Sequence, residues 1–189
     1  IGALAIALAR PSMVIAVPRE QATVILTMDV SGSMRATDVQ PDRLTAAGAA
    51  GIPQVVSLGA LDMVNFGPRD TVPDRFADRT FFVHNPTVTL MRTTVEENAE
   101  LGRRLGEKLA AAAGPTALVV PRRGVSALDA DGMPFHDAAA DAALVDAALD
   151  AVGGSPVTVV DADAHINDPD LAVRAADLLH DLIETRRGQ

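Results

Sequence analysis

Short apolar runs alternate with amphipathic stretches along most of the chain. The runs are continuous and rich in β-branched residues, which is typical of strands buried in a parallel sheet; they cover residues 23–28, 54–58, 81–84, 116–120 and 157–160. The stretches between them repeat apolar residues at helical spacing and cover residues 42–50, 95–113, 137–152 and those that follow Pro169. Strands separated by helices favour right-handed crossovers. The pattern therefore predicts an α/β, Rossmann-like, three-layer fold around a parallel sheet of about five strands.

The third apolar run, residues 81–84, is followed by a second β-like run over residues 88–91 and then by a helix start. Thr93-Thr94 with Glu96-Glu97 has the pattern of a capping box. A helix N-terminus carries unpaired N–H groups and a partial positive charge, so the start of this helix is a candidate anion-binding site. A capping threonine and a strand-ending His84 explain the same residues without a ligand.

Polar side chains follow most of the predicted strands. The carboxyl ends of parallel strands meet at one edge of a sheet, and ligands bind in the crevice beyond that edge. Arginine forks beside a glycine suit a phosphate group, with solvated arginines after a strand as the alternative. The predicted ligand site at this edge comprises His84, Asn85, Arg92, Thr93, Arg122, Arg123, Gly124, Asp163, His165 and Asn167.

Residues 161–168 concentrate carboxylates, an imidazole and an amide in one short segment. These groups suit Mg²⁺ binding or general acid–base chemistry. An Asx turn that caps the following helix would use the same residues. His136 lies in the loop before the helix 137–152 and is placed to join either this segment or the arginines.

Composition narrows the classes of partner. The chain has 189 residues, with 16 basic against 25 acidic side chains and a formal net charge of −9. No basic run is present, so we expect no nucleic-acid partner. The lack of cysteine excludes disulfides and thiolate metal sites. Residues 1–9 are almost wholly apolar but shorter than the ~20 residues that span a bilayer. We expect a cytoplasmic protein, or a membrane-associated one if an anchor begins upstream.

The predicted strand 23–28 runs directly into Asp29-Val30-Ser31-Gly32-Ser33. This loop resembles the metal-ion-dependent adhesion site of von Willebrand factor A domains, and its surroundings resemble the start of bacterial membrane-anchored members. The resemblance implies that Asp29, Ser31 and Ser33 are oxygen ligands of Mg²⁺. The family's continuation is not found after about residue 47, so the predicted Mg²⁺ affinity is weak.

A different resemblance covers residues 41–185. Its motifs include PDRLTAAGAAGIPQVVSLGALDMVNF, HNPTVTLMRTTVEENAELGRRLGEKL and DADAHINDPDLA, in that order. These resemble the carboxyl-terminal domain of the ATP-binding family typified by the tomato mosaic virus resistance protein. The chain is therefore interpreted as a join of two families, with an apolar tail or severed anchor (1–21), a von Willebrand A-like segment (22–47) and an α/β domain (48–189).

Three functional hypotheses follow from these observations. The first, implied by the second resemblance, is a domain that binds ATP or another small-molecule phosphate ligand, accompanied by Mg²⁺. The second is a Mg²⁺-dependent adhesion or recruitment module of the von Willebrand A type. The third is an enzyme that uses His84, Asp163 and His165 on a small carbonyl or carboxylate substrate. The second family also has an amino-terminal domain not found here, and the surface it would cover favours self-association.

Overall fold

The computed structural model describes residues 42–187, which form an α/β domain with two sheets. In chain order its elements are α2 (Arg43–Ala49), β1 (Gln54–Ser57), β2 (Met63–Phe66), the 3-10 turns η2 (Arg69–Thr71) and η3 (Asp74–Phe76), β3 (Phe81–Asn85), β4 (Val88–Arg92), α3 (Val95–Ala110), β5 (Thr116–Pro121), α4 (Ala138–Val152), β6 (Thr158–Ala162) and α5 (Pro169–Arg187). The predicted strand 23–28 lies outside the described residues and stays a prediction.

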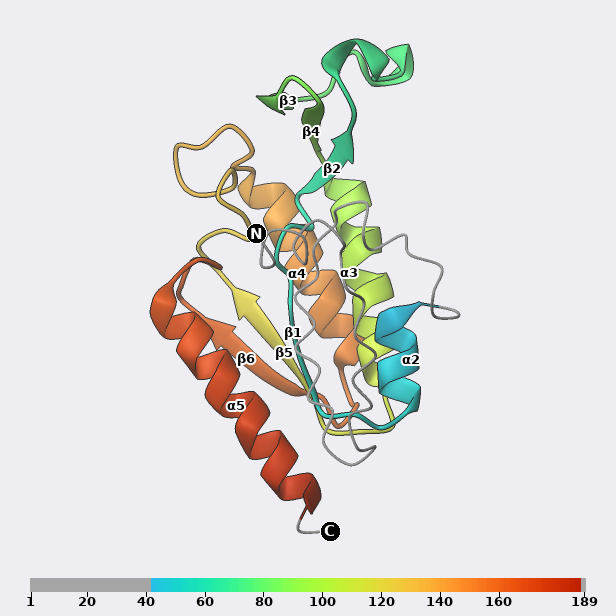
Figure 1. Ribbon diagram of the computed structural model, residues 1–189, viewed down its shortest axis with the longest axis vertical. Helices are drawn as coiled ribbons and strands as arrows, with labels where there is room; N and C mark the ends of the chain where they lie inside the picture. The colour runs from blue at the N-terminus through green and yellow to red at the C-terminus, as the bar shows by residue number, and fades with distance from the viewer. Residues whose placement is uncertain (1–41, 188–189) are drawn as a thin grey trace, which may run out of the picture.

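The central sheet is parallel, with the strand order β1-β5-β6. These are the predicted strands 54–58, 116–120 and 157–160, so the Rossmann-like α/β class is confirmed. Both crossovers advance in the same direction across the sheet, which places their helices on one face when each crossover is right-handed. Helices α3 and α4 do lie together on one face, and α5 covers the other (Figure 1).

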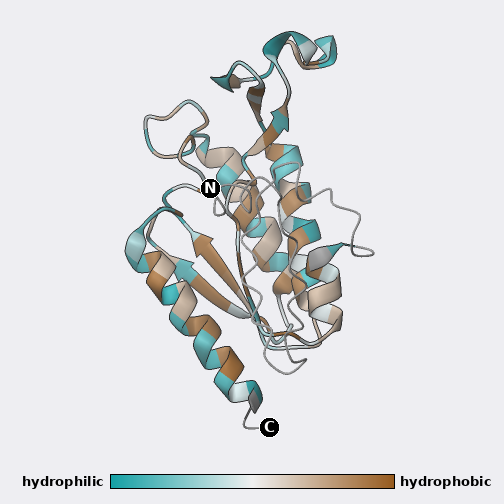
Figure 2. Cartoon of the chain, in the orientation of Figure 1, coloured by the Kyte–Doolittle hydropathy of each residue, from teal (hydrophilic) through white to brown (hydrophobic). Residues whose placement is uncertain are grey.

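Two apolar cores hold the three layers together. On one face of the parallel sheet, Val56 and Leu118 pack against side chains of α3 and α4 such as Leu109 and Leu144. On the other face, residues of the alternate strand positions pack against α5. In Figure 2, β5 is mainly hydrophobic, whereas α5 alternates hydrophilic and hydrophobic residues. None of the helices in the described range 42–187 is long and apolar enough to cross a membrane.

The prediction that residues 81–84 form a strand of the parallel sheet is wrong. Residues 81–84 belong to β3, which pairs antiparallel with β4 in a separate sheet of order β2-β4-β3. The physical reason is the short turn after β3, where the Asn85 side chain accepts hydrogen bonds from the backbone N–H and the hydroxyl of Thr87. The predicted loop 59–78 also contributes β2 to this sheet, which extends beyond the carboxyl end of the parallel strands (Figure 1).

An ion pair ties the segment just before β3 to the start of α3. Glu97 closes the predicted capping box with Thr94, and its carboxylate also accepts two hydrogen bonds from Arg79. The hydrogen bonds from Arg79 hold the pKa of Glu97 below its usual value. Thr94 and Glu97 therefore confirm the predicted helix start.

We expect Arg79→Ala to lower the free energy of unfolding at pH 7 by about 1 kcal/mol or less, since the Glu97 side chain is 42% exposed. Because the folded-state pKa is lowered, this stabilisation is present above the unfolded value near 4.5 and is lost as the pH falls through the folded value. Urea unfolding at pH 7 and pH 3 measures it. A difference between variant and wild type that grows toward pH 3 would contradict the assignment.

Candidate functional site

A cavity of about 430 Å³ opens where β5 ends and α4 begins. Its wall is formed by the turn that follows β5, by the loop before α4 and by the first turns of α4. We call it the β5 cavity; it is lined by Pro121, Arg122, Arg123, Gly124, Val125, Asp129, Asp131, His136, Ala138, Asp141, Ala142 and Val145. It lies at the carboxyl end of a parallel strand, where α/β sheets usually bind ligands.

Behind this wall lies Arg92, the last residue of β4, which is only 5% exposed. Its guanidinium donates from Nε to the carbonyl of Phe135 at 2.7 Å and from Nη2 to Asp141 Oδ1 at 2.5 Å. The Nη2 atom also lies 3.5 Å from Asp129 Oδ1. One arginine therefore connects β4 with the loop before α4 and with α4 itself.

Two acidic side chains, Asp129 and Asp141, pair with this guanidinium, which also donates to the backbone carbonyl of Asp62, and burial raises the pKa of all three carboxylates. Asp62 and Asp129 are fully buried, and Asp141 is half-buried. Removal of water from the carboxylates raises the pKa of Asp129 to about 6 and also raises the pKa values of Asp141 and Asp62. We call Arg92, Asp62, Asp129 and Asp141 the Arg92 cluster.

The turn after β5 is built to hold Asp129 in place. Gly124 has a φ of +121°, and a Cβ there would lie 2.9 Å from His165 Cδ2 and 3.0 Å from the Asp129 carbonyl oxygen. The N–H of Val125 donates to Asp129 Oδ2 at 2.9 Å. Ser126 donates from its hydroxyl to Asp62 Oδ2 at 2.6 Å. Glycine is therefore needed at position 124 because neighbouring groups approach the backbone closely.

His136 is the exposed member of the cavity wall. One ring nitrogen of His136 and one carboxylate oxygen each from Asp129 and Asp141 lie within 4.8 Å of one another. The Nδ1 atom of His136 lies 3.3 Å from the carbonyl oxygen of Asp129. Two carboxylates and an imidazole thus share one small volume beside open space, an arrangement suited to a cation or to proton transfer.

The arginines at the cavity rim are already paired with the β6 end of the sheet. Arg122 makes a two-pronged ion pair with Asp161, and Arg123 makes one with Asp163, with N···O distances of 2.7–2.8 Å. Hydrogen bonds from the arginines lower the pKa values of both carboxylates. Both ion pairs are exposed to solvent. At the rim the charges of the two arginines are therefore balanced by two aspartates, and both ion pairs are accessible to solvent.

The chain matches a known protein family over most of its length. Residues 23–183 match the C-terminal domain of the uncharacterised protein family UPF0261. The chain belongs to this family. The matched residues include the predicted strand 23–28 and Asp29, Ser31 and Ser33; the von Willebrand A resemblance of that segment stays a prediction, and these residues lie outside the described range.

Bacterial UPF0261 proteins align with most of this chain. The chain is 49% identical over 144 residues to a UPF0261 protein of Clostridium tetani and 44% identical over 161 residues to one of Rhizobium meliloti. It spans 36% and 40% of the length of these two relatives. It is also 50% identical over 93 residues to the ToMV resistance protein Tm-1(GCR237) of Solanum lycopersicum, covering 49% of this chain and 12% of that protein.

The UPF0261 domain brings some of the predicted site residues together and separates others. Those at the β5–β6 edge meet, because Arg123 pairs with Asp163 and Gly124 contacts His165. His165 uses both ring nitrogens: Nε2 lies 2.9 Å from the Ser126 carbonyl oxygen, and Nδ1 accepts the backbone N–H of Asn167. The other predicted residues lie elsewhere: His84 and Asn85 are exposed beside the β3–β4 turn, while Arg92 and Thr93 are buried beneath the cavity.

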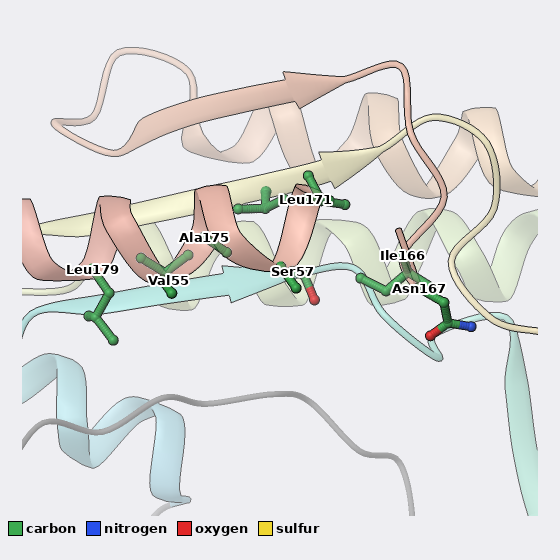
Figure 3. A pocket seen from close by; sticks show the side chains of 10 residues that line it. Val55, Ser57, Ile166, Asn167, Leu171, Ala175 and Leu179 are labelled. Atoms are coloured by element: carbon green, nitrogen blue, oxygen red, sulfur yellow. The ribbon is translucent and has the colours of Figure 1, made fainter. Parts of the chain in front are cut away.

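A second, mainly apolar cavity of about 300 Å³ lies between β1 and α5. Figure 3 shows Val55 and Ser57 on β1 beside Ala175 and Leu179 on α5, with Asn167 near the end of the groove. The predicted site residue Asn167 therefore faces a different cavity from Arg122 and Arg123. This groove offers few polar groups for a charged ligand.

Sequence reasoning missed Asp129 and Asp141, the two acidic residues closest to Arg92. A signal for Asp141 was available, because it precedes Leu144, Val145 and Ala148 at helical spacing on the inward side of α4. A carboxylate on an apolar helix face is rarely buried without a partner. No comparable pattern marks Asp129, which lies in an irregular turn.

Proposed function

We propose that this domain binds a small phosphate-bearing molecule, such as ATP or another nucleotide, at the β5 cavity. The observation that carries the proposal is the meeting of Arg122, Arg123 and Gly124 at the mouth of a 430 Å³ cavity beyond the carboxyl end of β5. Cavities of about 300–1,000 Å³ hold small ligands in proteins. The carboxyl edge of a parallel sheet is where such folds bind nucleotides.

The two arginines at the rim could exchange their aspartate partners for a phosphate group at little cost, which supports a phosphate ligand. Arg122 and Arg123 now hold Asp161 and Asp163 through exposed ion pairs, which contribute only about 0–1 kcal/mol each. A phosphate group offers the same two-pronged geometry with more oxygens and more negative charge. Replacement of the aspartates by a phosphate therefore costs little and adds charge-assisted hydrogen bonds.

A thermal-shift experiment on the full chain tests this proposal. We expect ATP, ADP or inorganic phosphate, with or without Mg²⁺, to raise the melting temperature of the wild type. Arg123→Ala should weaken ligand binding roughly tenfold or more, since a hydrogen bond to a charged group contributes about 1.5–3 kcal/mol. Arg122→Ala should also weaken ligand binding.

Arg104→Ala is the matched control. Arg104 is 67% exposed and pairs with one glutamate, while Arg123 is 65% exposed and pairs with one aspartate. The control should keep the full ligand-induced shift. The proposal is wrong if no phosphate compound shifts the melting temperature, or if Arg104→Ala reduces the shift as much as Arg123→Ala does. A shift produced by carboxylates alone and lost in His165→Ala would instead favour an enzyme acting on a carboxylate substrate.

A further inference from the structure

We infer that Asp129, His136 and Asp141 form a binding site for a divalent transition-metal ion, such as Zn²⁺, in the wall of the β5 cavity. The three side chains come from two elements that are adjacent in space, the loop after β5 and the first turn of α4. This inference is independent of the proposed phosphate ligand, because the metal is tested alone.

The spacing of the donor atoms fits a metal ion after a small adjustment. One donor atom from each residue lies within 4.8 Å of the other two. Zinc–nitrogen and zinc–oxygen bonds are about 2.0–2.2 Å long, so ligand atoms around a tetrahedral ion lie roughly 3–4 Å apart. His136 is exposed and lines the cavity, so a small shift of its side chain can close the remaining gap.

The hydrogen bond of His136 prepares its ring for this role. A carbonyl oxygen only accepts, so the contact between Nδ1 and the Asp129 carbonyl places the proton of the neutral ring on Nδ1. The Nε2 atom then keeps the lone pair that a metal needs. Metal-binding histidines commonly donate their other N–H to a backbone carbonyl in this way.

An independent observation is the excess of negative charge behind the site. Among the described residues, Arg92 is the one cation that pairs with the carboxylates of Asp129 and Asp141, and its contact with Asp62 is to the backbone carbonyl oxygen. Asp62 is fully buried, and its Oδ1 atom has no hydrogen-bond partner in the described part of the chain. A buried carboxylate without enough positive charge is costly. A divalent cation beside Asp129 and Asp141 would add positive charge where these two carboxylates now share one arginine.

The ligand set selects the class of metal. Imidazole together with carboxylates suits zinc and similar transition metals, whereas Mg²⁺ prefers oxygen ligands and retains several waters. The cavity beside the three residues leaves further coordination positions accessible to water or a ligand. We therefore expect Zn²⁺ to bind more tightly than Mg²⁺.

Calorimetric titration of the full chain with Zn²⁺, without phosphate compounds, tests the site. We expect one Zn²⁺ per chain and a weaker response to Mg²⁺. His136→Gln should reduce Zn²⁺ affinity roughly tenfold or more, because even partners one shell further out typically contribute that much. His84→Gln replaces another exposed histidine and is the matched control, and Asp131→Asn removes a carboxylate from the same cavity wall outside the three-residue set.

A second readout separates direct coordination from an indirect effect. Substoichiometric Mn²⁺ should broaden the ring resonances of His136 in the NMR spectrum and leave those of His84 sharp. The inference is overturned if Zn²⁺ does not bind, if His136→Gln and His84→Gln weaken binding equally, or if Mn²⁺ leaves the His136 ring unaffected. Loss of Zn²⁺ binding with an intact phosphate response would refute the metal site and leave the proposed function standing.

Discussion

Replacement of Arg92 by methionine is expected to lower the free energy of unfolding by about 3 kcal/mol or more at pH 7.5, the size of effect seen when one partner of a buried ion pair is removed. The variant keeps most of the side-chain length but leaves the carboxylates of Asp129 and Asp141 without their shared cation and removes a hydrogen bond to the Asp62 carbonyl oxygen. It also leaves the Phe135 carbonyl without the donor that it has at 2.7 Å. Urea unfolding followed by circular dichroism measures the loss.

The pH dependence of this loss identifies its origin. Burial raises the pKa of Asp129 to about 6, so lowering the pH to 5 in the variant neutralises a carboxylate that has lost its partner. The loss should therefore be smaller at pH 5 than at pH 7.5. Arg103→Met is the control, since Arg103 is 48% exposed and its pairs with Glu100 and Glu107 contribute little. A loss below about 1 kcal/mol, or one equal to that of Arg103→Met, would show that Arg92 does not hold the cluster together.

Local signals account for the part of the fold that the sequence predicted. The parallel strands β1 and β5 are apolar runs that need little beyond side chains that fill two buried faces, whereas the edge strand β6 buries only Val160 and Ala162. The starts of α3 and α4 depend on Thr94 and Asp137, whose side chains cap helices within three residues of their own position. Interactions of such short range can be predicted from residues that are close together in the sequence.

The antiparallel sheet and the Arg92 cluster depend on longer-range contacts. An isolated apolar run such as residues 81–84 does not say which strand it pairs with, and the neighbouring run 88–91 was the cue to a hairpin. Arg92 meets Asp62, Asp129 and Asp141 at sequence separations of 30, 37 and 49 residues. Apart from the inward helical spacing of Asp141, nothing local distinguishes these aspartates from solvated ones. The structure therefore brings together the predicted residues of the β5–β6 edge, whereas the predicted set did not include Asp129 and Asp141.

Substitution of Gly102 by alanine is expected to lower the free energy of unfolding by about 2–3 kcal/mol, in the upper range for overpacked cores. Gly102 lies in α3 where that helix meets α4, and a Cβ at this position would lie 2.2 Å from the carbonyl oxygen of Leu144. The obstacle is the main chain of another helix, so no side-chain rotation relieves it. Alanine favours a helix by about 1 kcal/mol over glycine, and the clash must exceed this gain for the variant to be less stable. The midpoint of urea unfolding measures the difference.

Gly48→Ala provides the comparison that isolates helix packing. Gly48 also lies inside a helix, but a Cβ there would approach no atom outside its own helix closer than 3.2 Å, the distance to the Cβ of Ala112. The gain in helix preference should then nearly offset the tight contact, leaving a change within about 1 kcal/mol. Gly106→Ala, whose Cβ would lie 2.7 Å from the Ala148 carbonyl oxygen, should fall between the two. Equal stability of Gly102→Ala and wild type would contradict the close contact between α3 and α4 at Gly102.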